Sequence, residues 1–135
     1  MANSTDVTAG TNIRASEFNN LRKDVVLGLA VAGTETDGAT VTIDLSDKTK
    51  GKIRSVTLGG NRTLALSNET VGQTFGLRII QDGTGSRTIT WWSGIKWDSG
   101  VTPVLSTTPA AIDVFVFFVV SAGVYDGYRV GSALA

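Results

Sequence analysis

Hydrophobic and polar residues alternate strictly over residues 39–45, where Val41, Ile43 and Leu45 are the apolar positions. This period of two places the three apolar side chains on one face of a β-strand. Looser alternation predicts further strands over residues 53–58, 62–66, 74–81, 87–91, 112–120 and 124–130. Short strands at a spacing of roughly ten residues are typical of an antiparallel β-sandwich or jelly roll. We therefore expect one all-β domain over residues 34–135.

The connections between these strands carry recognisable turn and loop residues. The glycine-rich segment Asp82–Gly85 predicts a hairpin between the strands on either side of it. A phosphate-binding loop is a poorer interpretation, because a strand pattern follows where such a loop needs a helix N-terminus. Residues 101–111 contain Pro103 and Pro109 and predict a loop, since proline cannot serve a central strand. No clear internal repeat is visible.

The most apolar strand is expected at residues 112–120. Its two faces carry Asp113, Phe115 and Phe117 on one side and Val114, Val116 and Phe118 on the other. A strand that is apolar on both faces is typically buried on both. This predicts a central strand, or one whose second face meets another subunit. Asp113 would be costly to bury unpaired, so we expect a structural ion pair with Arg78, Arg87 or Arg129, or a capped turn.

The first 33 residues have a different pattern and predict an N-terminal arm with a short helix. Phe18, Leu21 and Val25 recur at helical spacing after Ser16, which can cap the helix. So short a helix is marginal alone in water and needs a surface on which to dock. Its polar positions carry balanced charges rather than a basic face, so we expect it to dock on protein and not on a membrane.

Composition excludes several functional classes. The chain has 12 basic and 12 acidic residues, and a net charge of zero argues against a nucleic-acid partner. Histidine and cysteine are absent, which excludes His- or Cys-based nucleophilic catalysis and the usual zinc sites. No calcium-loop spacing is present either. We therefore expect no enzymatic activity, no metal and no cofactor. The N-terminus lacks a secretory signal pattern, and no apolar run is long enough for a membrane-spanning helix.

Three tryptophans lie close together at Trp91, Trp92 and Trp97. Alternation would place Trp91 and Trp92 on opposite faces, so at least one of them packs in a core or an interface. Trp92 or Trp97 is then the more exposed indole and forms, with Asp98, a candidate site for stacking on a glycan. Contact with another subunit is a further interpretation, because tryptophan is favoured at the centre of protein interfaces.

Several segments together resemble a module of bacteriophage virion proteins. They are residues 72–87, followed by Ile95–Trp97, Thr102–Leu105, Ala111–Val114 and Tyr125–Tyr128. Such modules occur in tail-fibre, tail-tip and head-decoration proteins. The resemblance covers roughly residues 39–130, and it lies in the order of the segments rather than in one motif. It implies a β-rich component of the phage particle that is often a homotrimer.

Two functions remain open. The first is a virion structural protein: a capsid decoration or head-fibre subunit that self-associates and attaches through its arm to the major capsid protein or a tail component. The second is a tail-fibre or tail-tip module that recognises host surface glycans. The residues expected to make subunit contacts are Phe18, Leu21 and Val25 in the arm helix, and Trp92, Trp97, Phe115 and Phe117 in the β domain.

Overall fold

A computed structural model describes residues 32–135, so the predicted arm helix with Phe18, Leu21 and Val25 lies outside the described residues. Strands make up most of the described chain, which confirms the all-β class. They are β2 (Ala32–Thr34), β3 (Thr40–Asp44), β4 (Ile53–Leu58), β5 (Arg62–Ser67), β6 (Thr74–Gln81), β7 (Ile89–Thr90), β8 (Ile95–Trp97), β9 (Ile112–Ser121) and β10 (Val124–Leu134). Two short 3-10 helices, η3 (Lys48–Lys50) and η4 (Asp98–Gly100), interrupt them. Since β2 begins at Ala32, the β domain extends beyond the predicted boundary at residue 34.

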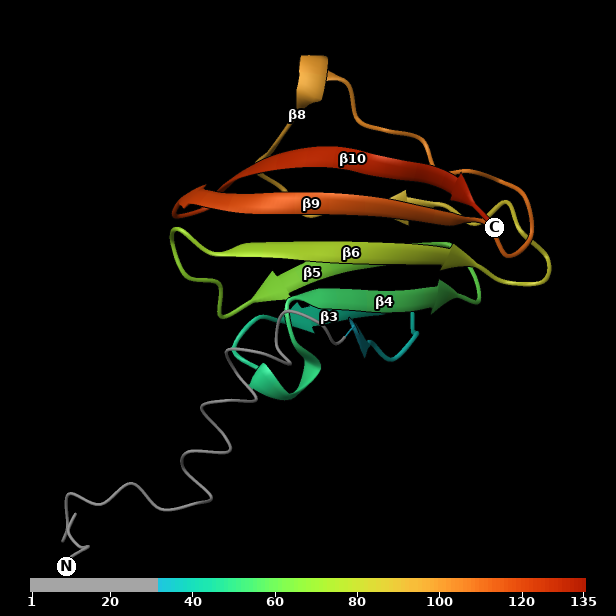
Figure 1. Ribbon diagram of the computed structural model, residues 1–135, viewed down its shortest axis with the longest axis horizontal. Coiled ribbons are helices and arrows are strands. Elements are labelled where there is room, and N and C mark those ends of the chain that lie inside the picture. The colour runs from blue at the N-terminus through green and yellow to red at the C-terminus, as the bar shows by residue number, and fades with distance from the viewer. Residues whose placement is uncertain (1–31) are drawn as a thin grey trace, which may run out of the picture.

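The strands form two sheets. A six-stranded sheet has the order β2-β4-β6-β9-β10-β8, and a three-stranded sheet has the order β3-β5-β7 (Figure 1). Strands β2, β4 and β6 run parallel, as do β3, β5 and β7. Only β9 pairs antiparallel, with β6 on one side and β10 on the other. The predicted antiparallel pairing is therefore wrong for most of the fold, and the larger sheet is mixed.

The first six strands follow a repeating path between the two sheets. The chain passes from β2 to β3, then from β4 to β5, then from β6 to β7, and each passage crosses from the larger sheet to the smaller one. Each passage forms one rung, and successive rungs stack in parallel. Ile53 pairs with Ala32 and Gly76 pairs with Ile53, so a rung takes a little over twenty residues. The backbone repeats although the sequence shows no clear repeat.

This path also corrects the predicted hairpin at Asp82–Gly85. The strands on either side, β6 and β7, belong to different sheets and do not pair with each other. The segment is a structural turn, but it carries the chain from the larger sheet to the smaller one instead of folding it back.

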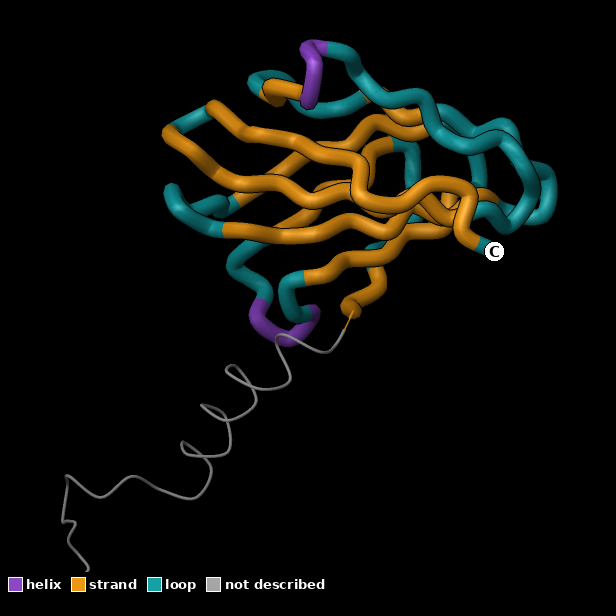
Figure 2. Tube along the Cα trace, turned by 45° about the horizontal axis from the view of Figure 1, so that its top comes forward, coloured by secondary structure: helices purple, strands orange, loops and turns teal. Residues whose placement is uncertain are grey.

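One apolar core lies between the sheets. The predicted alternation in β3 is confirmed, because Val41, Ile43 and Leu45 are all buried. From the larger sheet, Phe115 and Phe117 on β9 are fully buried in the same cluster. Residues 101–111 form the predicted loop, which leads from η4 along one side of the sheet to β9 (Figure 2).

A buried ion pair ties the connection between β3 and β4 to the first rung. Arg54 Nη1 donates to Glu35 Oε2 at 2.9 Å, and both side chains are almost wholly buried. The same guanidinium donates to the carbonyl oxygens of Asp44, Asp47 and Gly51. A buried charge with this many partners is strongly held in place, because loss of any partner would leave it uncompensated. The sequence did not predict this pair.

Candidate functional site

The most prominent surface feature is the side of the six-stranded sheet that points away from the three-stranded sheet, which we call the outer face. On β9 the outer face carries Ile112, Val114, Val116 and Phe118, and the last of these is 43% exposed. The intervening residues Phe115 and Phe117 point inward and are 0% exposed. Since side chains alternate along a strand, one face of β9 belongs to the core and the other is available for contact.

This arrangement corrects two of the predicted subunit contacts. Phe115 and Phe117 pack in the core against Trp91 and Trp92, so they have no surface to offer a partner. β9 is a central strand of its sheet, as predicted, but its second face is exposed at Phe118 and Val120 within residues 32–135, so contact of that face with another subunit stays a prediction.

Neighbouring strands extend the apolar character of the outer face. Val116 on β9 lies between Gly76 on β6 and Tyr128 on β10. The rings of Phe118 and Tyr128 meet edge to face with their centroids 6.0 Å apart. At the margins of the face, Ile53, Val120 and Leu134 are also large, apolar and exposed. Exposed apolar surface of this kind is typical of sites of contact with another molecule.

Two opposite charges flank the centre of the outer face. Arg78 on β6 lies opposite Val114, and Asp126 on β10 lies opposite Phe118. Within residues 32–135, the ion pairs involve Lys50, Arg54, Arg62 and Arg87 as cations, so neither Arg78 nor Asp126 takes part in one. Arg78 has one long hydrogen bond, from Nη1 to the Ser55 hydroxyl at 3.5 Å.

The three indoles form a packed cluster on the opposite side of β9. Trp91 lies edge to face on Phe115 and Trp92 lies tilted on Phe117, with ring centroids 4.8 Å apart in both cases. Trp97 in turn meets Trp91 at 5.0 Å. The prediction that Trp91 and Trp92 occupy opposite faces is wrong, because β7 ends at Thr90 and strand alternation does not extend to them.

The candidate glycan site is only partly assembled by this geometry. Trp92 and Trp97 are half-buried, while Asp98 is exposed at the start of η4. The indole Nε1 of Trp92 is buried and has no hydrogen-bond partner among residues 32–135. Stacking of a sugar on Trp92 or Trp97 stays a prediction.

Asp113 is buried on the inner face of β9, but its partners differ from those expected. Its carboxylate accepts from the Ser106 backbone N–H at 2.6 Å and from the Ser106 hydroxyl at 2.8 Å. It also accepts from the backbone N–H of Ala133 at 3.1 Å. The predicted ion pair with an arginine is therefore wrong: Arg87 pairs with Asp82, and Arg129 donates to a backbone carbonyl.

The turn after β6 is held by Asp82. Its carboxylate accepts from the backbone N–H groups of Thr84 and Gly85, each at 3.0 Å, and from Arg87 Nη2 at 2.8 Å. The bond from Arg87, followed by the bond from the Gly85 N–H, lowers the pKa of Asp82 to about 2. These contacts occupy the carboxylate fully, so the turn is structural and offers no phosphate site.

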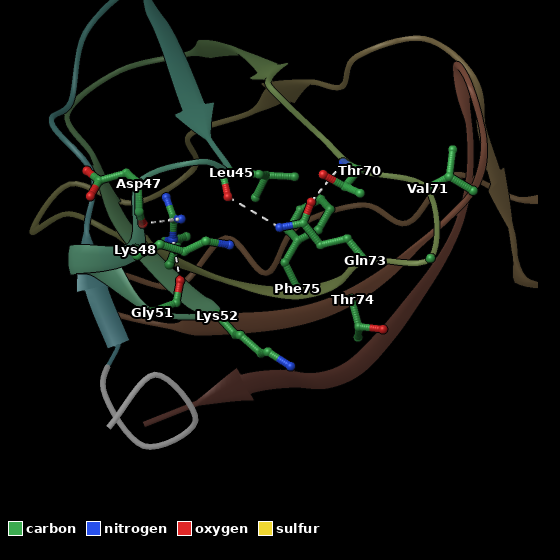
Figure 3. A pocket seen from close by; sticks show the side chains of 12 residues that line it. Leu45, Asp47, Lys48, Gly51, Lys52, Thr70, Val71, Gln73, Thr74 and Phe75 are labelled. Carbon is green, nitrogen blue, oxygen red and sulfur yellow. Dashed lines mark hydrogen bonds between the residues drawn. The ribbon is translucent and has the colours of Figure 1, made fainter. Parts of the chain in front are cut away.

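A cleft of about 510 Å³ opens beside η3 (Figure 3). It is lined by the connection from β3 to β4 on one side and by residues 70–75 on the other. Gln73 spans it, donating from Nε2 to the Leu45 carbonyl at 3.3 Å (Figure 3). The one acidic side chain in the lining, Asp47, already accepts two hydrogen bonds from Thr49. Among the described lining residues there is thus no pair of carboxylates of the kind that glycosidases use.

Residues 32–135 contain no group of three or more acidic side chains arranged to hold a metal ion. None of the helices in this range has the length and apolar character of a membrane span. Comparison of the chain with protein-family models, curated proteins and solved structures gives no match.

Proposed function

We propose that this chain is a non-enzymatic structural protein of a bacteriophage particle, a capsid-decoration or head-fibre subunit. It associates with copies of itself and attaches to the particle through its N-terminal arm. A homotrimer is the assembly that the resemblance to virion modules implies. The observation that carries the proposal is the outer face, where apolar side chains of β9 and β10 such as Phe118 and Tyr128 are exposed.

In a monomer the apolar outer face would be exposed to water. Monomeric proteins rarely leave a wide contiguous apolar patch exposed, so a patch of this kind is typical of a subunit in an assembly. The chain has a net charge of zero, which provides little electrostatic repulsion between copies. The assembly partner and its place on a virion come from the resemblance in the sequence.

The proposal is tested on phage particles. Virions of the phage that encodes the chain are purified by density gradient and their proteins are quantified by mass spectrometry. We expect the chain at a fixed copy number relative to the major capsid protein, at a level well above residual host proteins. Absence of the chain from purified virions would refute the proposal.

Gold-labelled antibody against the chain then places it on the particle. Label on the head supports the decoration or head-fibre role. Label confined to the tail tip instead supports the receptor-binding role and excludes the head assignment.

A further inference from the structure

We propose that the outer face is the contact surface between copies of this chain, with Arg78 of one copy paired to Asp126 of the next. This inference rests on the proposed function, since it names the surface by which the structural subunit associates. It moves the contact residues away from Phe115 and Phe117 to the opposite side of β9.

The centre of the outer face is apolar. Val116 lies at its middle, with Phe118 and Tyr128 packed edge to face beside it. Phe118 and Tyr128 are 43% and 41% exposed, so much of each ring is in contact with water when residues 32–135 stand alone. Removing this surface from water favours association.

Two opposite charges lie on either side of this apolar centre. Arg78 and Asp126 lie opposite Val114 and Phe118, on the strands to either side of β9, so Val116 is midway between them in the sheet register. Burying either charge without a partner would oppose association. Neither charge has an ion-pair partner within residues 32–135.

The placement of these charges indicates that the molecule bound to the outer face is another copy of the chain. On the β6 side of the face the charged residue is Arg78, and on the β10 side Asp126 lies beside Lys96 of β8 in the sheet register. When the β6 half of one copy lies against the β10 half of another, Arg78 meets Asp126. The two halves are then complementary to each other, so the contact runs from one copy to the next and closes into a ring when the rotation between copies allows it. A strongly acidic or strongly basic partner would leave one of the two charges unfavourably placed.

The experiment measures the mass of the full chain by light scattering over a range of concentrations. Val116→Glu puts a charge at the centre of the outer face. The matched control is Val104→Glu, which makes the same change at a valine that is 80% exposed in the loop before β9. We expect the native chain and V104E to be oligomers of equal mass and V116E to be a folded monomer by circular dichroism. A folded V116E with the native mass, or a monomeric native chain, would overturn the inference.

A charge-reversal series decides the question even if V116E does not fold. Arg78→Asp and Asp126→Arg each place like charges together, and we expect each to raise the dissociation constant by at least roughly tenfold. The double variant R78D/D126R restores opposite charges and should recover most of the native affinity. If the dissociation constant of the double variant rises by as much as the two single changes combined, the two residues do not meet.

The two proposals can fail separately. A chain that is absent from virions but loses its oligomer in V116E would refute the virion role alone. A chain that is present in virions but keeps its mass in V116E would refute the outer-face contact alone.

Discussion

The Tyr125 hydroxyl donates a hydrogen bond to Glu69 Oε2 at 2.5 Å, which joins the start of β10 to the connection between β5 and β6. The tyrosine ring is buried and meets Trp92 edge to face, with centroids 5.9 Å apart. Burial, followed by the bond to Glu69, raises the pKa of Tyr125 to about 12. The same bond lowers the pKa of Glu69.

The raised pKa of Tyr125 predicts that the fold loses stability only at strongly alkaline pH. Because the folded pKa of Tyr125 exceeds its ordinary value of 10.0, its contribution to stability is complete below that pH and is lost as the pH rises toward 12. The chain has two tyrosines, so Tyr128→Phe leaves Tyr125 as the sole reporter in an ultraviolet titration. We expect a midpoint near pH 12. A midpoint at the ordinary value would contradict the buried hydrogen bond.

The contacts of Asp82 in the turn predict that the stability of the fold depends on pH in the acid range. Its pKa falls from 3.8 to about 2, so its contribution is present above 3.8 and is lost as the pH falls toward 2. In the native chain the midpoint of urea unfolding should therefore decrease as the pH is lowered over this range. Asp82→Asn should make that decrease smaller. Some fall should persist, because the pKa of Asp44 is also lowered to about 2, chiefly by the Ser46 hydroxyl.

The control for this change is Asp98→Asn. The Asp98 side chain is exposed and forms no hydrogen bond within residues 32–135. D98N should leave the acid dependence as it is in the native chain. An equal effect of D82N and D98N would mean that the turn contacts do not form in solution.

Asp113 is predicted to be a buried polar residue whose loss is costly. Asp113→Ala leaves the donors of Ser106 and Ala133 unsatisfied, and we expect it to lower the free energy of unfolding by roughly 2 to 4 kcal/mol. Asp113→Asn should cost less, since one oxygen still accepts. Ser106→Ala removes one bond and should cost about 1 kcal/mol. Urea unfolding of the three variants checks this order, and equal losses would contradict it.

Gly127 on β10 is predicted to tolerate no side chain. A Cβ there would lie 2.8 Å from Ile95, 2.9 Å from Trp97 and 3.0 Å from Phe117. Gly127→Ala overpacks this site and should destabilise the fold by about 1 to 3 kcal/mol, with a shift in tryptophan fluorescence. Gly83→Ala is the matched control, because no atom lies within 4 Å of its Cβ position. If the two substitutions cost the same, the close packing around Gly127 is wrong.

Most strands could be predicted from the sequence because their signal is local, but the short strands β2 and β8 were missed and the pairing partners could not be predicted. The alternation at Val41 and Ile43 requires no knowledge of distant residues. Parallel pairing of β3 with β5 depends on contacts more than twenty residues apart, which no local pattern encodes. The sequence does contain a weak signal of this pairing. A threonine precedes an apolar residue at Val41, Leu64 and Trp91. In the structure these threonines are aligned, since Thr40 pairs with Thr63 and Thr63 pairs with Thr90.

The candidate site shows the same limit. Both faces of β9 are apolar, so alternation separates Phe117 from Phe118 without indicating which of them is buried. The choice depends on the donors that meet Asp113 on the inner face, and these come from Ser106 and Ala133 on other segments. Phe115 and Phe117 were therefore predicted as contact residues although they lie on the buried side of β9.

The parallel rungs constrain how a chain of this architecture can change in length. A single strand cannot be added to one sheet alone between β2 and β7, since the chain alternates between the sheets at every crossing. Growth or shortening in this region must proceed in whole increments of one strand in each sheet, with a little over twenty residues gained or lost together. Within residues 32–135, β2 and β3 each have a neighbour on one side only, so the edge next to the N-terminal segment is where such an increment disturbs the fewest existing pairs.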